Sequence, residues 1–230
     1  MKQSDNTTPY QACEYDKNVR QTIPFYEFLH AETIDLVKSL KPQAKNWLDT
    51  GCGTGYLIES ALSHFPHTLF VLADPADGML GEAKKRLGGV SPEQIQFVDP
   101  MASGNLPEKL NAQPEVITAV MCHHYLKPEK RLVATKACYD TLAPEGVYIT
   151  FENIRPQCEE VVELSLERWG RFQISQGRSR TIVEEHLKRF NKAYFPITVA
   201  EHLDLLKECG FRVAELFWYS QMQAGFYAIK

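Results

Sequence analysis

The chain has 230 residues, of which 44% are hydrophobic and 23% charged, and its formal net charge is −4 at pH 7. This length suffices for one large α/β domain with a buried core, and the acidic balance argues against a surface for duplex nucleic acid. No run approaches the ~20 apolar residues of a membrane span, and the polar first eight residues carry no apolar signal region. The six cysteines are scattered without metal-finger or redox spacing, so we expect reduced thiols, a cytoplasmic protein and no metal site.

Alternating strands and helices are predicted over the first two thirds of the chain. Apolar residues at helical spacing predict a helix over residues 25–40, which ends before Pro42. Strands are then expected at residues 46–49, 68–73, 95–98, 115–121 and 147–151, with helices at 56–65, 77–87 and 128–142. Strands separated by helices of this length predict a parallel, doubly wound (Rossmann-like) sheet.

The pattern changes after Glu152. Helices are predicted at residues 161–172, 179–190 and 199–209, and two apolar-rich runs at 211–218 and 223–229 indicate an antiparallel hairpin. The predicted fold is therefore α/β, with a mostly parallel seven-stranded sheet, a C-terminal antiparallel hairpin and a helical insertion before it. We expect a single domain over residues 1–230, made of an N-terminal helical lid (1–45), a cofactor-binding core (46–152), a helical substrate-side insertion (153–197) and the last helix with the terminal hairpin (198–230).

The most informative motif is a glycine turn at the end of the first predicted strand. Asp49 ends this strand, and Gly51, Gly53 and Gly55 follow at every second position, where the missing Cβ lets a ligand lie on the backbone. A dinucleotide fingerprint needs its third glycine one position later, and Tyr56 stands there. The motif suits the aminocarboxyl end of S-adenosylmethionine (SAM) better than a pyrophosphate. A glycine-rich turn without a ligand is the structural alternative.

Two more strands are followed by acidic residues. Asp74 ends the second strand, where a carboxylate can hydrogen-bond the ribose hydroxyls of an adenosine. Asp99 follows the third strand and can read the adenine amine. A charge at the edge of a buried sheet costs stability without a partner, so three in succession indicate a ligand.

These motifs resemble the class I SAM-dependent methyltransferases, in the segments 48–55, 72–75, 98–99 and 142–146. The resemblance implies SAM as cofactor, S-adenosylhomocysteine (SAH) as product, and a cofactor site formed by Tyr26, Asp49, Gly51, Cys52, Gly53, Gly55, Asp74, Pro75, Met79, Asp99, Pro100, Met101 and Met121. Met79 and Met101 either pack on the adenine or fill the core. Because Pro75 and Pro100 have no N–H, a backbone donor to the adenine would have to come from Met101.

The flanking segments resemble the carboxy-SAM synthase branch of that family, whose members use SAM and prephenate to make carboxy-SAM for tRNA wobble-uridine modification. The resemblance lies in residues 15–16, 23–26, 174–179, 202, 210–211, 216–218 and 228–230. It implies that Tyr26 touches the cofactor and that Arg178 binds the carboxylate of carboxy-SAM. The chain departs from the branch in a longer stretch between Arg178 and Gly210, in the ordinary methyltransferase form of its glycine motif, and in Val120, where the branch has asparagine. These departures favour ordinary methyl transfer.

Three residues at strand ends are candidates for catalysis. His123 and His124 follow the fourth strand, where a neutral imidazole could take a proton from an acceptor, and Glu152 ends the fifth, where it could position an amine or hydroxyl. The alternative is that one histidine caps the following helix, the other packs under the cofactor, and Glu152 holds a loop.

The insertion supplies candidates for substrate binding. Arginines crowd around Trp169 and Phe172, at positions 168, 171, 178 and 180, which indicates either an anion-binding wall or a solvated helix face. With Tyr15 of the lid, which would exclude water, Trp169 and Arg178 are the predicted substrate-binding residues.

The sequence therefore favours a SAM-dependent methyltransferase that acts on a small, anionic acceptor. A carboxy-SAM synthase-like enzyme is one alternative, and a non-catalytic SAM-binding protein, with both histidines and Glu152 turned away from the methyl, is another. Tyr56 and the terminal hairpin count against a nicotinamide dehydrogenase. The expected partner is a small molecule, without membrane or duplex nucleic acid; a tRNA anticodon loop stays open, and the hairpin and insertion helices allow a homodimer.

Overall fold

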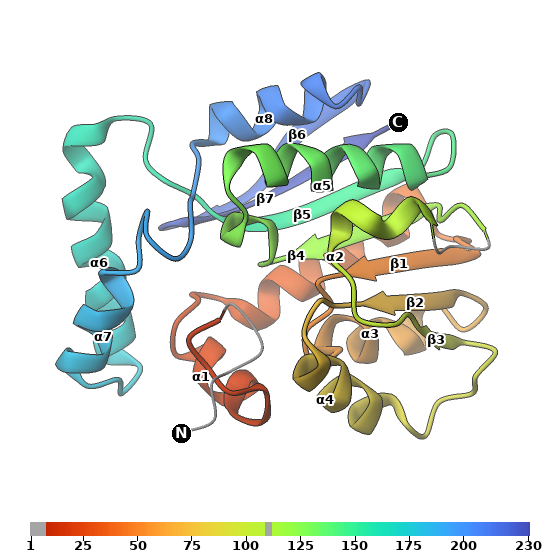
Figure 1. The fold of residues 1–230 in the computed structure, drawn as a ribbon, viewed down its shortest axis with the longest axis horizontal. Helices are drawn as coiled ribbons and strands as arrows, with labels where there is room; N and C mark the ends of the chain where they lie inside the picture. Colours follow the sequence, from red (N-terminus) through yellow and green to blue (C-terminus); the bar gives the residue numbers. More distant parts are fainter. Residues whose placement is uncertain (1–7, 109–111) are drawn as a thin grey trace.

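The computed structural model describes residues 8–108 and 112–230, and a seven-stranded sheet forms the centre of this part of the chain (Figure 1). The parallel strands are β1 (Asn46–Thr50), β2 (Leu69–Ala73), β3 (Ile95–Phe97), β4 (Val116–Val120) and β5 (Val147–Asn153). The antiparallel strands β7 (Gln223–Ile229) and β6 (Val213–Ser220) extend the sheet beyond β5. The strand order β3-β2-β1-β4-β5-β7-β6 confirms the predicted fold class. It reverses direction between β1 and β4, where open α/β sheets bind ligands at the carboxyl ends of their strands.

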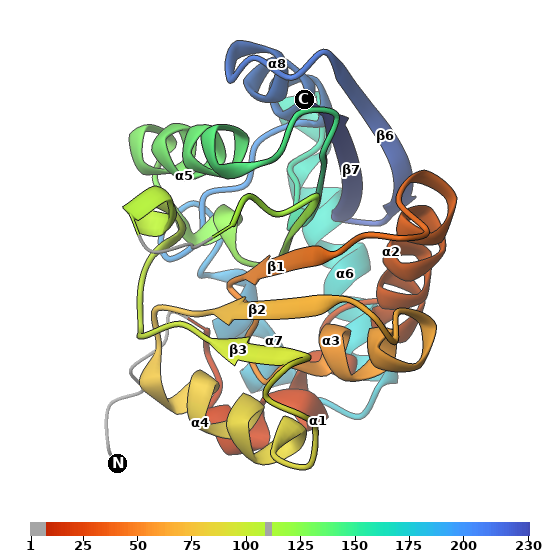
Figure 2. The same cartoon turned by 90° about the vertical axis from the view of Figure 1, so that its right-hand side faces the viewer.

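Helices cover both faces of this sheet. On one face lie α2 (Tyr26–Leu40), α3 (Tyr56–Ala61) and α4 (Asp77–Leu87), and on the other lie α5 (Pro128–Thr141) and α8 (Val199–Glu208) (Figure 2). Beyond the carboxyl ends of the strands lie α1 (Tyr15–Arg20), α6 (Val162–Ser175) and α7 (Arg180–Leu187) (Figure 1). Residues 1–7 of the expected lid are outside the described residues.

The predicted elements agree with the structure to within a few residues, with two differences. Helix α1 was not predicted, because six residues are too few to show a helical period. Strand β5 continues two residues further than expected, since β7 pairs with both Glu152 and Asn153. This extension decides where the side chains of these two residues point.

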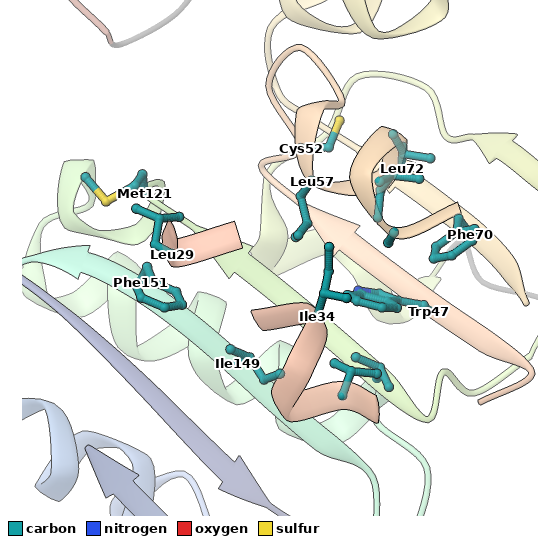
Figure 3. Close-up of a cluster of buried hydrophobic side chains, with 14 of the residues drawn as sticks. Leu29, Ile34, Trp47, Cys52, Leu57, Phe70, Leu72, Met121, Ile149 and Phe151 are labelled. Carbon is teal, nitrogen blue, oxygen red and sulfur yellow. The ribbon is translucent and has the colours of Figure 1, made fainter. Parts of the chain in front are cut away.

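A cluster of buried apolar side chains lies between the sheet and helices α2 and α3 (Figure 3). Trp47 and Phe151 are fully buried in it, and Cys52 and Met121 belong to the same cluster. The indole N–H of Trp47 donates to the hydroxyl of Thr118, at 2.9 Å, and this hydroxyl donates to Oδ1 of Asp49, at 2.7 Å. The core thereby fixes the orientation of Asp49, near the carboxyl end of β1.

The insertion, residues 153–197, packs against the N-terminal segment, residues 8–25. The indole N–H of Trp169 donates to the backbone carbonyl of Thr22, at 2.6 Å, and the side chain of Trp169 is fully buried. These two segments together cover the carboxyl ends of the central strands. Among the described residues, no helix has the length and apolar character needed to cross a membrane.

Candidate cofactor and substrate site

Three adjoining hollows lie at the carboxyl ends of β1, β2 and β4, and Tyr15 and Met121 line all three. The glycine-turn hollow is also lined by Tyr26, His30, Asp49, Gly51, Cys52, Gly53, Thr54, Tyr56, Leu57 and Val120. The Asp74 hollow, of about 150 Å³, is also lined by Gly51, Gly53, Asp74, Pro75, Ala76, Met79, Val120 and Tyr125, among others. The Thr22 hollow is also lined by Tyr10, Val19, Thr22, Ile23, Tyr125, Asn153 and His186, among others.

The glycine turn needs its glycines for two different reasons. Gly51, Gly53 and Gly55 all have positive φ, at 68°, 55° and 78°, a region that side-chain-bearing residues rarely adopt. A Cβ on Gly51 would lie 2.6 Å from the Cβ of Cys122, whereas a Cβ on Gly53 would meet nothing within 4 Å. Gly51 therefore serves the packing of β1 against the turn after β4, and Gly53 leaves open space beside the backbone.

Asp74 lines the hollow that is named after it and forms hydrogen bonds with the surrounding backbone. Its side chain is 7% exposed and accepts hydrogen bonds from the amides of Gly53 and Ala76, each at 2.9 Å. The carboxylate lines the hollow, and a group of this kind can accept hydrogen bonds from the hydroxyls of a ligand. Pro75 and Met79 line the same hollow.

Asp49 lies at the floor of the glycine-turn hollow and is 2% exposed. Burial raises the pKa of its carboxyl to about 7; the hydrogen bond from Thr118 opposes this, and the charge of Asp74 adds to it. A buried carboxylate of this kind gains from a cationic ligand, which would compensate its desolvation.

Met121, the residue after β4, has φ of +56° although it is not a glycine. Such strained backbone persists where the surrounding structure holds it in place, and it concentrates at functional sites. Here the amide of Met121 donates to the carbonyl of Phe151, at 2.7 Å, which ties the turn to β5. The side chain of Met121 is held where the three hollows meet.

The expected adenine contacts after β3 lie outside the three hollows. Asp99 and Pro100 are exposed, and Met101 is buried in the apolar cluster on the other face of the sheet, with Leu48 and Leu106. The Met101 amide donates to the backbone carbonyl of Asp74, at 3.2 Å, so this N–H is already used within the protein.

The predicted catalytic residues form a closed polar network that lines none of the three hollows. Glu152 is fully buried and accepts four hydrogen bonds, from the amides of His123 and His124, from Nδ1 of His124 at 2.6 Å, and from the hydroxyl of Thr150. Burial alone would raise the pKa of Glu152, but the hydrogen bond from His124 holds it at about 2. The expectation that this carboxylate faces an acceptor needs correction, because it fastens the turn after β4 instead.

The two histidines have similar structural surroundings. His123 lies 3.0 Å from the hydroxyl of Ser103 through Nε2 and 3.2 Å from that of Tyr148 through Nδ1, and burial lowers its pKa to about 4. His124 donates from Nδ1 to the carboxylate, so its Nε2 accepts from the side-chain amide of Asn153, at 3.1 Å. The ring nitrogens of both imidazoles contact other groups of the protein. This corrects the expectation that they reach the methyl group of the cofactor.

Of the three predicted substrate-binding residues, only Tyr15 lines the hollows. Trp169 is enclosed between the insertion and the N-terminal segment, so its expected contact with a substrate is corrected to a structural one. Arg178 is buried, donates to the side chains of Thr22 and Gln173, and lies over the ring of Tyr10, at 5.6 Å. In the described part of the chain it forms no ion pair with a carboxylate, and Arg168, Arg171 and Arg180 are exposed.

The structure adds residues that sequence reasoning missed. His30, Tyr56, Tyr125 and Asn153 line the hollows. His30 follows Tyr26 by one helical turn, and this i, i+4 spacing was the available signal. Asn153 follows Glu152 in an extended strand, so the two side chains point to opposite faces.

Comparisons with known proteins agree with this architecture. Residues 48–148 match the profile of a methyltransferase domain family. The chain is 25% identical over 222 residues to the carboxy-S-adenosyl-L-methionine synthase of a Nitratiruptor species, covering 95% of this chain and 90% of that protein.

Solved structures show the same fold at lower identity. The magnesium protoporphyrin IX methyltransferase of Synechocystis PCC 6803 with bound SAH has a TM-score of 0.65 at 13% identity, covering 96% of this chain and 95% of that one. Human N-acetylserotonin methyltransferase in complex with SAM has a TM-score of 0.59 at 16% identity; the match covers 98% of this chain but spans only 60% of the human chain. Residues 48–148 are thus similar to a methyltransferase domain, and the chain has the fold of these SAM-dependent methyltransferase structures.

Proposed function

We propose that this protein binds SAM across the glycine-turn and Asp74 hollows and transfers its methyl group to a small anionic acceptor held in the Thr22 hollow. The observation that carries the proposal is the junction of the three hollows at Met121 and Tyr15. Asp49 would hold the amino group of the cofactor and Asp74 its ribose. The Thr22 hollow then offers an acceptor a place beside the reacting centre, beneath the N-terminal segment.

The surroundings of the Thr22 hollow favour an acceptor that needs no base from the protein. Among its described lining residues there is no carboxylate, and burial lowers the pKa of His186 to about 3. Burial raises the pKa of the Tyr15 and Tyr125 phenols, so these side chains donate hydrogen bonds rather than remove protons. Methyl transfer is a displacement that depends on alignment and exclusion of water. The acceptor atom would therefore arrive as an anion or with a free lone pair.

A carboxy-SAM synthase-like activity is a second candidate, and Arg178 is the observation that favours it. A buried guanidinium is costly without an anion, and the described residues supply only neutral partners. Relatives of the chain are named carboxy-S-adenosyl-L-methionine synthases, and the resemblance around residues 174–179 implies an arginine that binds the carboxylate of carboxy-SAM. The burial of His123, His124 and Glu152 also matches the expectation for a non-catalytic SAM-binding protein, so turnover has to be measured.

Native mass spectrometry of the purified protein, followed by calorimetric titration with SAM and carboxy-SAM, tests the proposal. Under the leading proposal SAM binds, and an acceptor screen yields SAH. Copurified carboxy-SAM, with a preference for it that is lost in Arg178→Gln but kept in the exposed control Arg171→Gln, would replace methyl transfer with the second candidate. Binding of neither sulfonium would reject both, and tight SAM binding without turnover would support the non-catalytic alternative.

A further inference from the structure

His30 is a buried polar side chain in the wall of the glycine-turn hollow. It lies on α2, is 4% exposed, and lines the glycine-turn hollow together with Asp49 and Gly53. Neither ring nitrogen has a hydrogen-bond partner among the described residues. Buried polar atoms are nearly always hydrogen-bonded, because an unpaired one loses its water without compensation. An unpaired side chain in the wall of a hollow indicates a partner that arrives with a ligand.

The surrounding rings fix this imidazole in place. Tyr26 and Tyr56 meet it edge to face, with ring centroids at 4.7 Å and 5.1 Å. Burial lowers the pKa of His30 to about 3, and the charge of Arg20 acts in the same direction. The ring is therefore neutral at physiological pH and offers one N–H donor and one acceptor nitrogen.

Apart from the phenols of Tyr15, Tyr26 and Tyr56, the rest of the glycine-turn hollow offers a carboxylate few donors that are not already used. Its described lining residues include no arginine or lysine. The amides of Cys52, Gly53 and Gly55 already donate to the carbonyl of Ala73, the carboxylate of Asp74 and the carbonyl of Cys52. Asp49 can accept from an ammonium group but cannot donate to a carboxylate once ionised. An amino-acid end of a ligand thus finds an acceptor in Asp49 and, in His30 of the same hollow, a ring N–H that has no partner among the described residues.

We infer that His30 donates its ring N–H to the carboxylate at the amino-acid end of SAM and of SAH. The inference rests on the proposed binding of SAM and assigns a specificity role within that site. His30 favours adenosyl ligands that carry an aminocarboxyl group over 5′-methylthioadenosine, which has the same adenosine and sulfur but lacks that group. The competing explanation is that His30 only completes the aromatic cluster with Tyr26 and Tyr56, and this explanation predicts no such preference.

Calorimetric titration of His30→Phe with SAH and with 5′-methylthioadenosine separates the two explanations. Phenylalanine keeps the ring and its packing but removes both nitrogens. We expect SAH affinity to fall about ten- to a hundred-fold, the factor for one hydrogen bond to a charged group, while affinity for 5′-methylthioadenosine changes less than about two-fold. His30→Gln, which restores a donor, should recover part of the SAH affinity.

His202→Phe is the matched control. His202 is also buried, its Nε2 also has no partner in the described part of the chain, and it stacks on Phe226, at 4.7 Å, outside the three hollows. This variant should bind both ligands like the wild type. Equal losses for both ligands in His30→Phe, or undiminished SAH affinity, would overturn the inference while leaving the proposed function intact. A wild-type protein that binds neither SAM nor SAH would overturn both.

A second measurement does not depend on how the variants fold. In wild-type protein labelled with ¹⁵N at histidine, SAH should shift the ring nitrogens of His30, whereas 5′-methylthioadenosine should leave them nearly unchanged. Identical shifts with both ligands would contradict the inference.

Discussion

Asp16 of α1 forms an ion pair with Arg86 of α4, and the pair fastens the N-terminal segment across the glycine turn. Asp16 also accepts from the hydroxyl of Thr54, at 2.7 Å, and Arg86 donates to the backbone carbonyl of Thr54, at 2.8 Å. Both charged side chains therefore form hydrogen bonds with the same residue of the glycine motif. Thr54 therefore links the N-terminal segment, which covers the hollows, to the glycine turn that lines them.

Arg86→Met should loosen this cover. We expect SAM to dissociate faster and its affinity to fall about three- to ten-fold, because partly exposed ion pairs each contribute about 1 kcal/mol or less. Stopped-flow dissociation at low and high salt measures the effect, and the wild type should approach the variant as salt rises. Arg212→Met, which removes a surface ion pair with Glu145, is the control. A dissociation rate that is unchanged in Arg86→Met would show that the ion pair does not restrain the segment.

Glu152→Gln should lower stability. Removing the charge from a carboxylate that accepts four buried hydrogen bonds should destabilise the fold by about 3 kcal/mol, which corresponds to roughly 6–12 °C in Tm. Exposed Glu184→Gln should leave Tm unchanged. Differential scanning calorimetry gives the Tm and an assay of the same sample gives the turnover, and together they distinguish a structural role of Glu152 from a catalytic one. Lost turnover at an unchanged Tm would restore the catalytic interpretation.

The same carboxylate predicts a pH dependence of folding. Its pKa is about 2 in the folded protein against an ordinary value of 4.5, so the folded state favours the ionised form. The stabilisation is complete above about pH 4.5 and is lost as the pH falls toward 2. Urea unfolding from pH 3 to 7 should show the wild type and Glu152→Gln converging at the acid end. A constant difference across this range would contradict the assignment.

The carboxyl of Asp49 should make stability depend on pH in the opposite direction to Glu152, and it should also make SAM binding depend on pH. Its pKa of about 7 lies above the ordinary 3.8, so keeping it ionised costs the unliganded fold stability as the pH rises from about 4 to 7. A cationic amino group binds the ionised form, so SAM affinity should fall up to ten-fold per pH unit below about 7. Calorimetry at pH 6 to 8.5 should show this slope, along with proton release on binding. Asp49→Asn should flatten the slope, weaken SAM binding and raise the Tm of the unliganded protein at pH 8.

Two glycine variants should separate folding from binding. Gly51→Ala forces a Cβ to within 2.6 Å of Cys122 and should prevent stable folding, with partial rescue by Cys122→Gly. Gly53→Ala meets open space, so it should cost only about 1–2 kcal/mol from its positive φ, yet weaken SAM binding as the methyl enters the hollow. Thermal melts with and without SAM measure both effects. A normal melt for Gly51→Ala would show that the turn can relax.

The sequence predicted the sheet well, and it also predicted which strand-end residues of the candidate site lie together, for a physical reason. In a parallel sheet the carboxyl ends of the strands lie at the same edge, so the positions of Asp49, Asp74 and the glycine turn near strand ends sufficed to predict that they lie together. The order of strands and helices along the chain predicted the topology, because strand–helix–strand connections of this length can be arranged in only a few ways.

The rest of the candidate site depends on contacts between segments that are distant in the sequence, and the positions of the strand ends do not predict these contacts. Whether Glu152 or Asn153 faces the hollow depends on how far β5 runs, and that depends on pairing with β7, some 70 residues later. Trp169 and Arg178 were expected at the substrate, but the docking of the insertion onto Thr22 buries both. His30 lies in a stretch whose apolar spacing predicts only a helix, and only the three-dimensional surroundings show that its nitrogens have no partner among the described residues.

Thr22 has a consequence for the catalytic cycle. Its carbonyl is held by Trp169 and its hydroxyl by Arg178, so one residue joins two segments that are nearly 150 positions apart in the chain. Neither segment can swing outward without breaking a bond to the other. We therefore expect an ordered kinetic scheme, in which SAM enters before the acceptor and SAH leaves last, with opening of this joint as the slow step of each turnover.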